Sequence, residues 1–330
     1  MKKFISILLG VCLLLAIISG CTPNKDSAQS SDKINVVSTI FAPYDFVREI
    51  AGEQAELTML LPPGSESHSY EPTPRDIITI QNCDVFIYIG GDSDEWVNEV
   101  LESMDTSKME IITLMDCVEV VEEEIVEGME DDDHDYSYSD EELDPAHVDD
   151  HEEVAELDEH VWTSPQNAKI IVQKISDTLC AVDATNAANY QKNTKAYLTQ
   201  LNELDTKFKE VIHSAQRKTL IFGDRFPFRY FADAYGLEYF AAFPGCSTET
   251  EASAATVAFL IDKIKAENIP VIFHVELSNK KMANAISEAT GAKVLLLHAC
   301  HNITKDEMTN GVTYIDLMNQ NVKNLKEALQ

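Results

Sequence analysis

Residues 186–214 read NAANYQKNTKAYLTQLNELDTKFKEVIHS, a run without glycine or proline. Apolar side chains recur along it at helical spacing, at Tyr190, Tyr197, Leu201, Leu204 and Phe208. The pattern predicts one rigid helix about 40 Å long at ~1.5 Å per residue, which is the height of a domain. A strut of this length would restrict hinge motion, so we expect only a small closure on ligand binding. His213, near its end, is interpreted as a structural or surface residue.

Short apolar runs alternate with helical patterns on both sides of this helix. Before it, the runs are residues 34–39, 57–61 and 84–90, with helical patterns between them at 41–50 and 73–81. After it, residues 218–222 and 292–297 are predicted strands, and His274 and Glu276, in IFHVELSN (272–279), end another. Strands separated by helices predict an α/β fold with parallel sheets covered on both faces. Ligands of such folds collect beyond the carboxyl ends of the strands.

The amino-terminal residues have the features of an export signal. Lys2 and Lys3 precede an apolar run over residues 4–18, which is too short to span a bilayer comfortably. The small residues before Cys21 resemble the lipobox of bacterial lipoproteins, which implies cleavage before Cys21 and acylation of its thiol; a chance cysteine is the alternative. Residues 22–33 are polar and are interpreted as a tether. We expect the protein to be exported and held by lipid on the outer face of the cell membrane.

Composition excludes some classes of function. The 57 acidic and 25 basic residues give a net charge of −32, so nucleic acid is not an expected partner. Just over 300 residues follow Cys21, enough for two domains of ordinary size. Five cysteines remain beyond it, an odd number without CxxC spacing, which does not describe a disulfide framework. One bridge is allowed, and most are expected to be buried thiols: Cys83, Cys117, Cys180, Cys246 and Cys300.

Residues 122–159 form an acidic segment, with 20 acidic residues in 38 positions and no lysine or arginine. It also holds His134, His147 and His151. So charged a segment cannot bury enough apolar surface to offset its ordering entropy, and we expect a mobile loop. Carboxylates with interspersed imidazoles attract divalent cations and suit zinc better than magnesium or calcium. The alternative is a solvated linker that keeps the protein soluble.

Two histidines of the first half stand in segments that precede predicted helices. His68 follows the strand at 57–61, in a loop stiffened by prolines, and Thr73 is placed to cap the next helix. His160 opens the sequence HVWTSP, which precedes a helix beginning near Pro165. A single loop histidine is usually a surface residue, but two in such positions favour a shared metal site.

The motifs PPGSESHSYEPTPRD (62–76) and DEHVWTSPQNA (158–168), separated by the acidic segment, resemble those of the metal-binding receptors of ABC importers for zinc and manganese. The acidic histidine-containing segment is similar to that of the zinc branch. The resemblance implies two (βα) lobes with mainly parallel sheets, joined by one long rigid helix, with the metal in the cleft between the lobes. It also implies that His68 and His160 are ligands.

The resemblance implies the following organisation of the chain. Residues 1–20 would be the signal peptide, 21–33 the tether, 34–185 the first lobe with its acidic loop, 186–215 the connecting helix and 216–330 the second lobe.

The second lobe departs from the family pattern. The family usually offers a histidine or glutamate where this chain has Arg225, whose protonated side chain cannot bind a cation. Asp224 is the nearest substitute ligand; alternatively, Asp224 and Arg225 form an ion pair lining the cleft. In the loop after residues 292–297 the family places its final ligand, commonly an aspartate, and either His298 or His301 takes that position.

Two imidazoles beside a thiol fit zinc better than manganese, which favours oxygen. A core-packed His298 with a surface His301 is the alternative. Glu276 is interpreted as a structural group rather than a ligand, and Cys246 is given no role.

The resulting hypothesis is a monomeric receptor that captures Zn²⁺ and delivers it to an ABC permease. No phosphate-binding motif occurs in the chain, so the ATPase would be a separate protein. A manganese- or iron-type receptor, or a metal-binding adhesin of the same fold, is the alternative. A secreted zinc hydrolase is less favoured, because no HExxH motif or evident general base accompanies the histidines.

Overall fold

The structure is a computed structural model that describes residues 33–66, 70–129, 156–247 and 252–330. Residues Ile34–Gln330 form one compact unit. Within the part of the chain described, no helix has the length and apolar character needed to cross a membrane. The predicted signal peptide, lipidation site at Cys21 and most of the tether lie outside the described residues.

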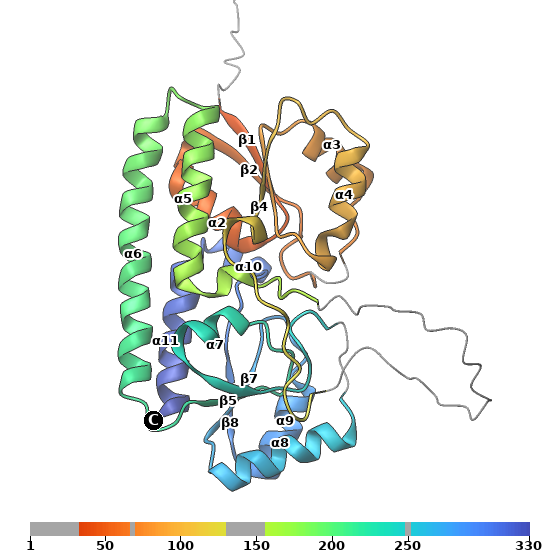
Figure 1. Cartoon of the computed structure of the whole chain (residues 1–330), viewed down its shortest axis with the longest axis vertical. Coiled ribbons are helices and arrows are strands. Elements are labelled where there is room, and N and C mark those ends of the chain that lie inside the picture. The colour runs from red at the N-terminus through yellow and green to blue at the C-terminus, as the bar shows by residue number, and fades with distance from the viewer. Residues whose placement is uncertain (1–32, 67–69, 130–155, 248–251) are drawn as a thin grey trace, which may run out of the picture. The chain divides into compact units, whose positions relative to one another are not determined.

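The first half contains one parallel sheet with the strand order β2-β1-β3-β4. Its strands are β1 (Ile34–Ser38), β2 (Ala55–Met59), β3 (Val85–Tyr88) and β4 (Glu110–Thr113). Its helices are α2 (Phe41–Ala51), α3 (Pro74–Gln81) and α4 (Glu95–Glu102), with short 3₁₀ turns at Gly52–Gln54, Asp92–Asp94 and Met115–Cys117. The predicted parallel α/β architecture is confirmed (Figure 1).

Thr73 begins α3 in the way its sequence position predicts. Its hydroxyl accepts a hydrogen bond from the Asp76 backbone N–H, and the Asp76 carboxylate accepts one from the Thr73 N–H at 2.8 Å. This reciprocal capping satisfies backbone donors that the first turn leaves without partners. The cap therefore fixes the residue at which α3 begins.

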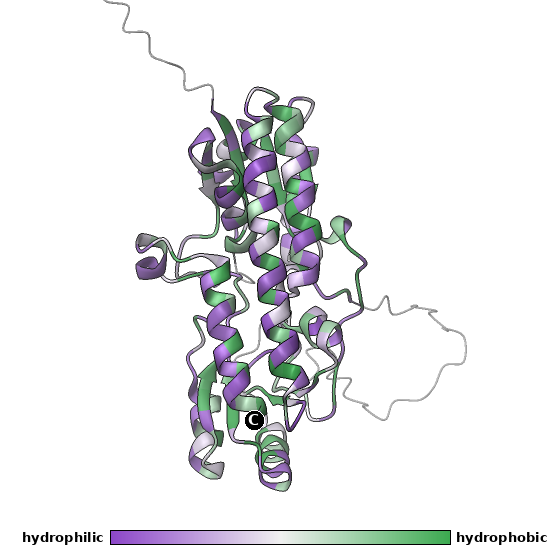
Figure 2. Cartoon of the chain, turned by 90° about the vertical axis from the view of Figure 1, so that its left-hand side faces the viewer, coloured by the Kyte–Doolittle hydropathy of each residue, from purple (hydrophilic) through white to green (hydrophobic). Residues whose placement is uncertain are grey.

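The long helix is α6 (Ala187–His213), which agrees with the predicted segment to within one residue at each end. The five apolar residues that predicted it are all buried. It packs beside α5 (Pro165–Val182) and α2 in the first half, and beside α11 (Tyr314–Leu329) and α7 (Arg229–Tyr235) in the second. The alternation of purple and green along α6 in Figure 2 follows its polar and apolar positions. One helix thus spans both halves.

The second half contains two pairs of parallel strands. They are β5 (Thr219–Ile221) with β6 (Glu238–Phe240), and β7 (Val271–His274) with β8 (Lys293–Leu296). A parallel bridge between Phe222 and Phe273 places β5 beside β7. The remaining helices are α8 (Ala254–Glu267), α9 (Lys281–Thr290) and α10 (Lys305–Thr309).

Loops of the two halves are hydrogen-bonded to each other where the strands end. The Asn302 side-chain Nδ2 donates to the carbonyl oxygens of Pro62 at 2.9 Å and Ser65 at 2.8 Å. The Tyr230 hydroxyl donates to the Asp158 carbonyl oxygen at 2.6 Å. These contacts fix the first residues of the two predicted histidine motifs, 62–76 and 158–168.

All five cysteines beyond Cys21 are free thiols, so the bridge that the sequence allowed does not form. Only Cys83 and Cys300 are buried, whereas Cys117, Cys180 and Cys246 are partly exposed. The expectation that most would be buried is therefore wrong. These cysteines therefore contribute no disulfide to the fold, and Cys83 and Cys300 contribute to it as members of its apolar core.

Asp94 should make the protein less stable as the pH rises. Burial raises the pKa of this carboxyl to about 7, although it accepts a hydrogen bond from the Ile89 N–H at 2.6 Å. The folded state therefore holds a proton that the unfolded chain has released, so the stability it contributes is full below the ordinary pKa of about 3.9 and is lost as pH rises through 7. Denaturation at pH 5 and pH 8 measures how much the free energy of unfolding falls between these values. This fall should be about 1–3 kcal/mol smaller for D94N than for the native chain. Equal losses in both proteins would contradict this.

Candidate metal centre

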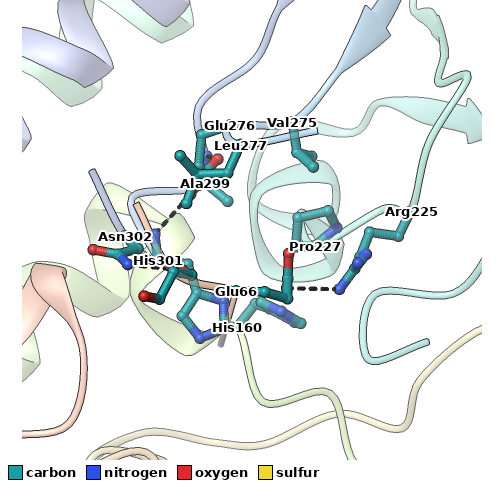
Figure 3. A pocket seen from close by; sticks show the side chains of 11 residues that line it. Glu66, His160, Arg225, Pro227, Val275, Glu276, Leu277, Ala299, His301 and Asn302 are labelled. Atoms are coloured by element: carbon teal, nitrogen blue, oxygen red, sulfur yellow. Dashed lines mark hydrogen bonds and ion pairs between the residues drawn. The ribbon is translucent and has the colours of Figure 1, made fainter. Parts of the chain in front are cut away.

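A cavity of about 40 Å³ lies between the two halves of residues 34–330. Its first-half lining comes from the segment after β2 and from His160, and its second-half lining comes from the segments after β5, β7 and β8 (Figure 3). The polar side chains of this lining are those of Ser65, Glu66, His160, Arg225, Glu276, His301 and Asn302. Two histidines that are 141 positions apart in the chain therefore share one cavity.

His160 and His301 are placed for a common ion. Their ring centroids lie 5.6 Å apart, with the ring planes at 84°. Both residues are buried, with 0% and 7% of their surface exposed. An ion ~2.1 Å from one nitrogen of each ring would place the ring centres roughly 5 Å apart. The observed separation therefore needs only a small adjustment to admit a cation.

His160 is oriented by Asp158. The Asp158 Oδ1 atom accepts a hydrogen bond from the His160 backbone N–H at 2.8 Å and lies 3.3 Å from the His160 Nδ1 atom. Because a carboxylate can only accept, the Nδ1 atom carries the proton and Nε2 carries the lone pair that a metal needs. Burial lowers the pKa of His160, but the negative charges of Asp158, Glu159 and Glu123 outweigh it and raise the pKa.

His301 is oriented through its backbone by Glu276. The two carboxylate oxygens of Glu276 accept hydrogen bonds from the backbone N–H groups of His301 at 2.9 Å and Ala299 at 2.7 Å. Cys300, between them, has a φ of 60°, in the left-handed region that residues other than glycine seldom adopt. Glu276 thus holds a strained turn that directs His301 into the cavity, which agrees with its interpretation as a structural group.

His298 lies next to this turn but does not line the cavity. Its Nδ1 atom accepts a hydrogen bond from the Cys300 N–H at 2.9 Å. Its backbone N–H and carbonyl oxygen are both bonded to the side-chain amide of Asn321, at 2.8 Å each. With 2% of its surface exposed, His298 is packed in the interior. Of the two histidines that could take the final position, His301 is the one that the structure brings to His160.

Asp224 is likewise held outside the cavity. Its Oδ1 atom accepts a hydrogen bond from the Arg225 backbone N–H at 3.0 Å, and it lines a neighbouring depression beside Met282. Arg225 does line the cavity, but its Nη1 atom is paired with Glu66 Oε1 at 3.1 Å. The two open alternatives for this position, an Asp224 ligand or an Asp224–Arg225 side-chain pair, both differ from this arrangement.

Several predicted site residues lie outside the described residues. They are His68, the three histidines of the acidic segment (His134, His147 and His151) and Cys21. Ser65 and Glu66, which shortly precede His68, do line the cavity.

Sequence reasoning missed Glu66 and Asp158. A carboxylate two residues before each histidine, Glu66 before His68 and Asp158 before His160, is the signal that could have found both, since metal-binding imidazoles commonly donate to a carboxylate.

A second group of donor atoms lies at the base of the acidic segment. Ligand atoms of Glu123, Glu156 and Cys246 are all within 4.8 Å of one another. The Glu123 N–H donates to the Glu156 carbonyl oxygen at 2.8 Å, and the Cys246 N–H donates to Glu123 Oε1 at 2.9 Å. Burial raises the pKa of the Cys246 thiol well above its ordinary value. The thiol is therefore protonated at neutral pH. The hydrogen bonds of Glu123 join the two ends of the acidic segment to each other and to the loop after β6.

Glu276→Gln should weaken metal binding without unfolding the protein. The carboxylate accepts hydrogen bonds from two backbone N–H groups, whereas the glutamine amide has only one oxygen. Its NH₂ group would face the second N–H without forming a hydrogen bond, so the turn that carries His301 would loosen. Loss of such an orienting group typically costs 10–100-fold in metal affinity. Competition titration against a zinc chelator measures this, and E276D serves as the variant that keeps the charge. An unchanged affinity in E276Q would show that the turn does not position His301.

The two parallel α/β halves, the helix that spans them and the cavity with an imidazole from each side define a two-lobe solute-binding receptor of the metal-binding class. A family model described as ZnuA, zinc-uptake complex component A, periplasmic, matches residues 36–328. The chain therefore belongs to the ZnuA family, and the resemblance to zinc receptors of ABC importers is confirmed.

Similar proteins support the same assignment. The chain is 31% identical to the high-affinity zinc uptake system protein ZnuA of Bacillus subtilis (strain 168) over 322 residues, covering 97% of this chain and 96% of that protein. It is 30% identical to the zinc-binding lipoprotein AdcA of Streptococcus pneumoniae, of which it spans 61%, over 99% of its own length. The Zn(II)-bound ZnuA-like domain of that AdcA has the same fold, with a TM-score of 0.69 and 29% identity over 90% of this chain and 99% of that domain.

Proposed function

We propose that this protein is an extracytoplasmic receptor that captures Zn²⁺ and delivers it to an ABC-type permease driven by a separate ATPase. The observation that carries the proposal is the pair His160 and His301, buried together in one cavity with ring centroids 5.6 Å apart. Neutral imidazoles suit zinc, whereas manganese favours oxygen ligands. Membership of a family of zinc-uptake components supports the same cargo and the same partners.

His160 and His301 are the ligands at the centre of this proposal. His68 is proposed as a further ligand, because Ser65 and Glu66 of its loop line the cavity. His298 and Asp224 are not proposed as ligands, because both are held by other hydrogen bonds away from the cavity. The protein is proposed to bind and release the ion without chemical turnover, as a monomer.

The acidic segment and the lipid anchor complete the proposal. His134, His147 and His151, among many carboxylates, would hold Zn²⁺ loosely and raise its concentration near the cavity. Cys21 would carry the lipid that keeps the receptor at the outer face of the membrane. The native protein should be found in the membrane fraction, and a C21S variant should be lost from it. This result would support the lipid anchor.

The test combines binding with growth. Isothermal titration should give tight binding of one Zn²⁺ in the cavity and much weaker binding of Mn²⁺. A strain that lacks the gene should grow poorly under zinc chelation and recover with the native gene or added zinc. Rescue by manganese, or normal growth of the deletion strain under chelation, would contradict the proposed cargo.

Zinc affinity should fall as the medium is acidified. A protonated imidazole has no lone pair for the metal, so protons compete with Zn²⁺ for His160 and His301. Because neighbouring carboxylates raise the pKa of His160 above 6.5, its competition begins at a higher pH than for a free histidine. Below that pKa, affinity should drop by about tenfold per pH unit for each titrating imidazole. Chelator competition between pH 8 and pH 5.5 measures this, and a flat profile would contradict imidazole ligation.

A further inference from the structure

The guanidinium of Arg225 lies in the same cavity as the two histidines. Its side chain is 12% exposed, and its Nη1 atom is 3.1 Å from Glu66 Oε1 (Figure 3). Its Nε atom is buried without a hydrogen-bond partner among the described residues. A fixed positive charge beside a cation site repels the cation unless an anion lies between them. The carboxylate that pairs with this guanidinium is that of Glu66, which lines the same cavity.

The two carboxylates that line the cavity differ in whether an oxygen remains that could bind a cation. Both oxygens of Glu276 accept backbone hydrogen bonds, from Ala299 and His301. Glu66 uses Oε1 for Arg225, and within the described residues its Oε2 makes no hydrogen bond or ion pair. A carboxylate has about four lone-pair positions, so Oε2 can accept a cation while Oε1 stays with the guanidinium.

The loop that carries Glu66 is fixed next to His301. Asn302, the residue after His301, donates from its side chain to the carbonyl oxygens of Pro62 and Ser65. The Gly64 N–H donates to the Ile303 carbonyl oxygen at 2.8 Å. These bonds join the segment before Glu66 to the segment that positions His301. Figure 3 shows the Glu66 side chain paired with the Arg225 guanidinium in the cavity that His160 and His301 also line.

We propose that Glu66 is a ligand of the bound cation through Oε2, and that Arg225 is the positioning residue that holds its carboxylate through Oε1. This inference rests on the proposed zinc function and adds an oxygen ligand to it. A carboxylate with imidazoles is a ligand set that zinc accepts, at ~2.0–2.2 Å for the oxygen. The arginine thus supports the site through the glutamate, and removing it should weaken binding rather than relieve repulsion.

The experiment measures zinc affinity of E66Q, R225M and the double variant by chelator competition, together with zinc K-edge X-ray absorption of the loaded proteins. We expect E66Q and R225M each to lose about 10–100-fold in affinity, the range typical for groups that orient a ligand. The double variant should lose little more than E66Q alone, because Arg225 acts on the site only by holding the Glu66 carboxylate. The absorption spectrum of E66Q should lack one short oxygen contact that the native protein has.

The chain offers a matched control pair. Arg229 Nη1 lies 3.1 Å from Glu124 Oε2, and this glutamate side chain is 46% exposed, as is that of Glu66. Neither residue lines the cavity. E124Q and R229M should therefore bind zinc within about threefold of the native protein, which would exclude a general effect of removing an ion pair.

Tighter or unchanged zinc binding by R225M would overturn the proposal, as would an E66Q spectrum identical to that of the native protein. The spectrum of E66Q decides the question even if R225M is too unstable to assay, because the Glu66 side chain is 46% exposed and its amide variant should fold. His160→Ala separates the two levels of the account. If H160A binds weakly and E66Q binds normally, only the role of Glu66 fails; if both bind normally, the proposed function fails with it.

Discussion

Replacing His160 with alanine should lower zinc affinity by more than about a hundredfold, because loss of a mere orienting group already costs 10–100-fold. The imidazole is fully buried in the cavity. Asp158 holds the proton on Nδ1, which leaves the Nε2 lone pair for the metal. The measurement is competition against a zinc chelator of known affinity at pH 7.5. Loss of this ligand leaves His301 with too few partners to hold the ion.

His213→Ala is the control for this experiment. His213 is exposed and is the last residue of α6. It does not line the cavity. H213A should bind zinc as the native protein does. A melting curve of H160A shows whether the fold is intact, and native affinity in a folded H160A would remove His160 from the site.

Trp162→Ala should cause the largest loss of stability of any substitution considered, about 3–5 kcal/mol. Trp162 has 0% exposed surface and packs against His301, with ring centroids 5.0 Å apart. Its Nε1–H donates to the Ala299 carbonyl oxygen at 2.8 Å, so truncation also leaves a buried acceptor without its donor. Urea denaturation of the metal-free protein gives the free energy of unfolding.

Two further variants separate packing from hydrogen bonding. W162F keeps most of the apolar volume and loses the N–H donor, so it should cost about 1–3 kcal/mol. Trp96 is only partly buried, and its Nε1 has no hydrogen-bond partner among the described residues. W96A should therefore be less destabilising than W162A. Equal losses for W96A and W162A would mean that Trp162 has no special part in joining the halves.

The regular elements could be predicted because their signals are local. The run at 186–214 contains no residue that breaks a helix, and α6 occupies nearly all of it. The alternation of apolar runs and helical patterns likewise predicted the parallel sheets. β4 (Glu110–Thr113) and β6 (Glu238–Phe240) were missed because each begins with a glutamate and holds only two consecutive apolar residues, so no apolar run marks the strand.

The site was only partly predictable, because its geometry depends on contacts between distant segments. His298 and His301 stand on the same short turn, and the sequence does not indicate that Cys300 adopts a left-handed conformation usually given to glycine or asparagine. The pairing of Glu66 with Arg225 spans 159 positions, so nothing local points to it. Asp158 was concealed among many other carboxylates, although it is the one that orients His160.

The central claim is that His160 and His301 bind one zinc ion in the cavity between the two halves. A crystal of the zinc-loaded protein with anomalous scattering measured at the zinc edge tests it most directly. The account predicts a single strong peak ~2.0–2.1 Å from a ring nitrogen of each of these histidines. A peak at Glu123, Glu156 and Cys246 with none between His160 and His301 would contradict it.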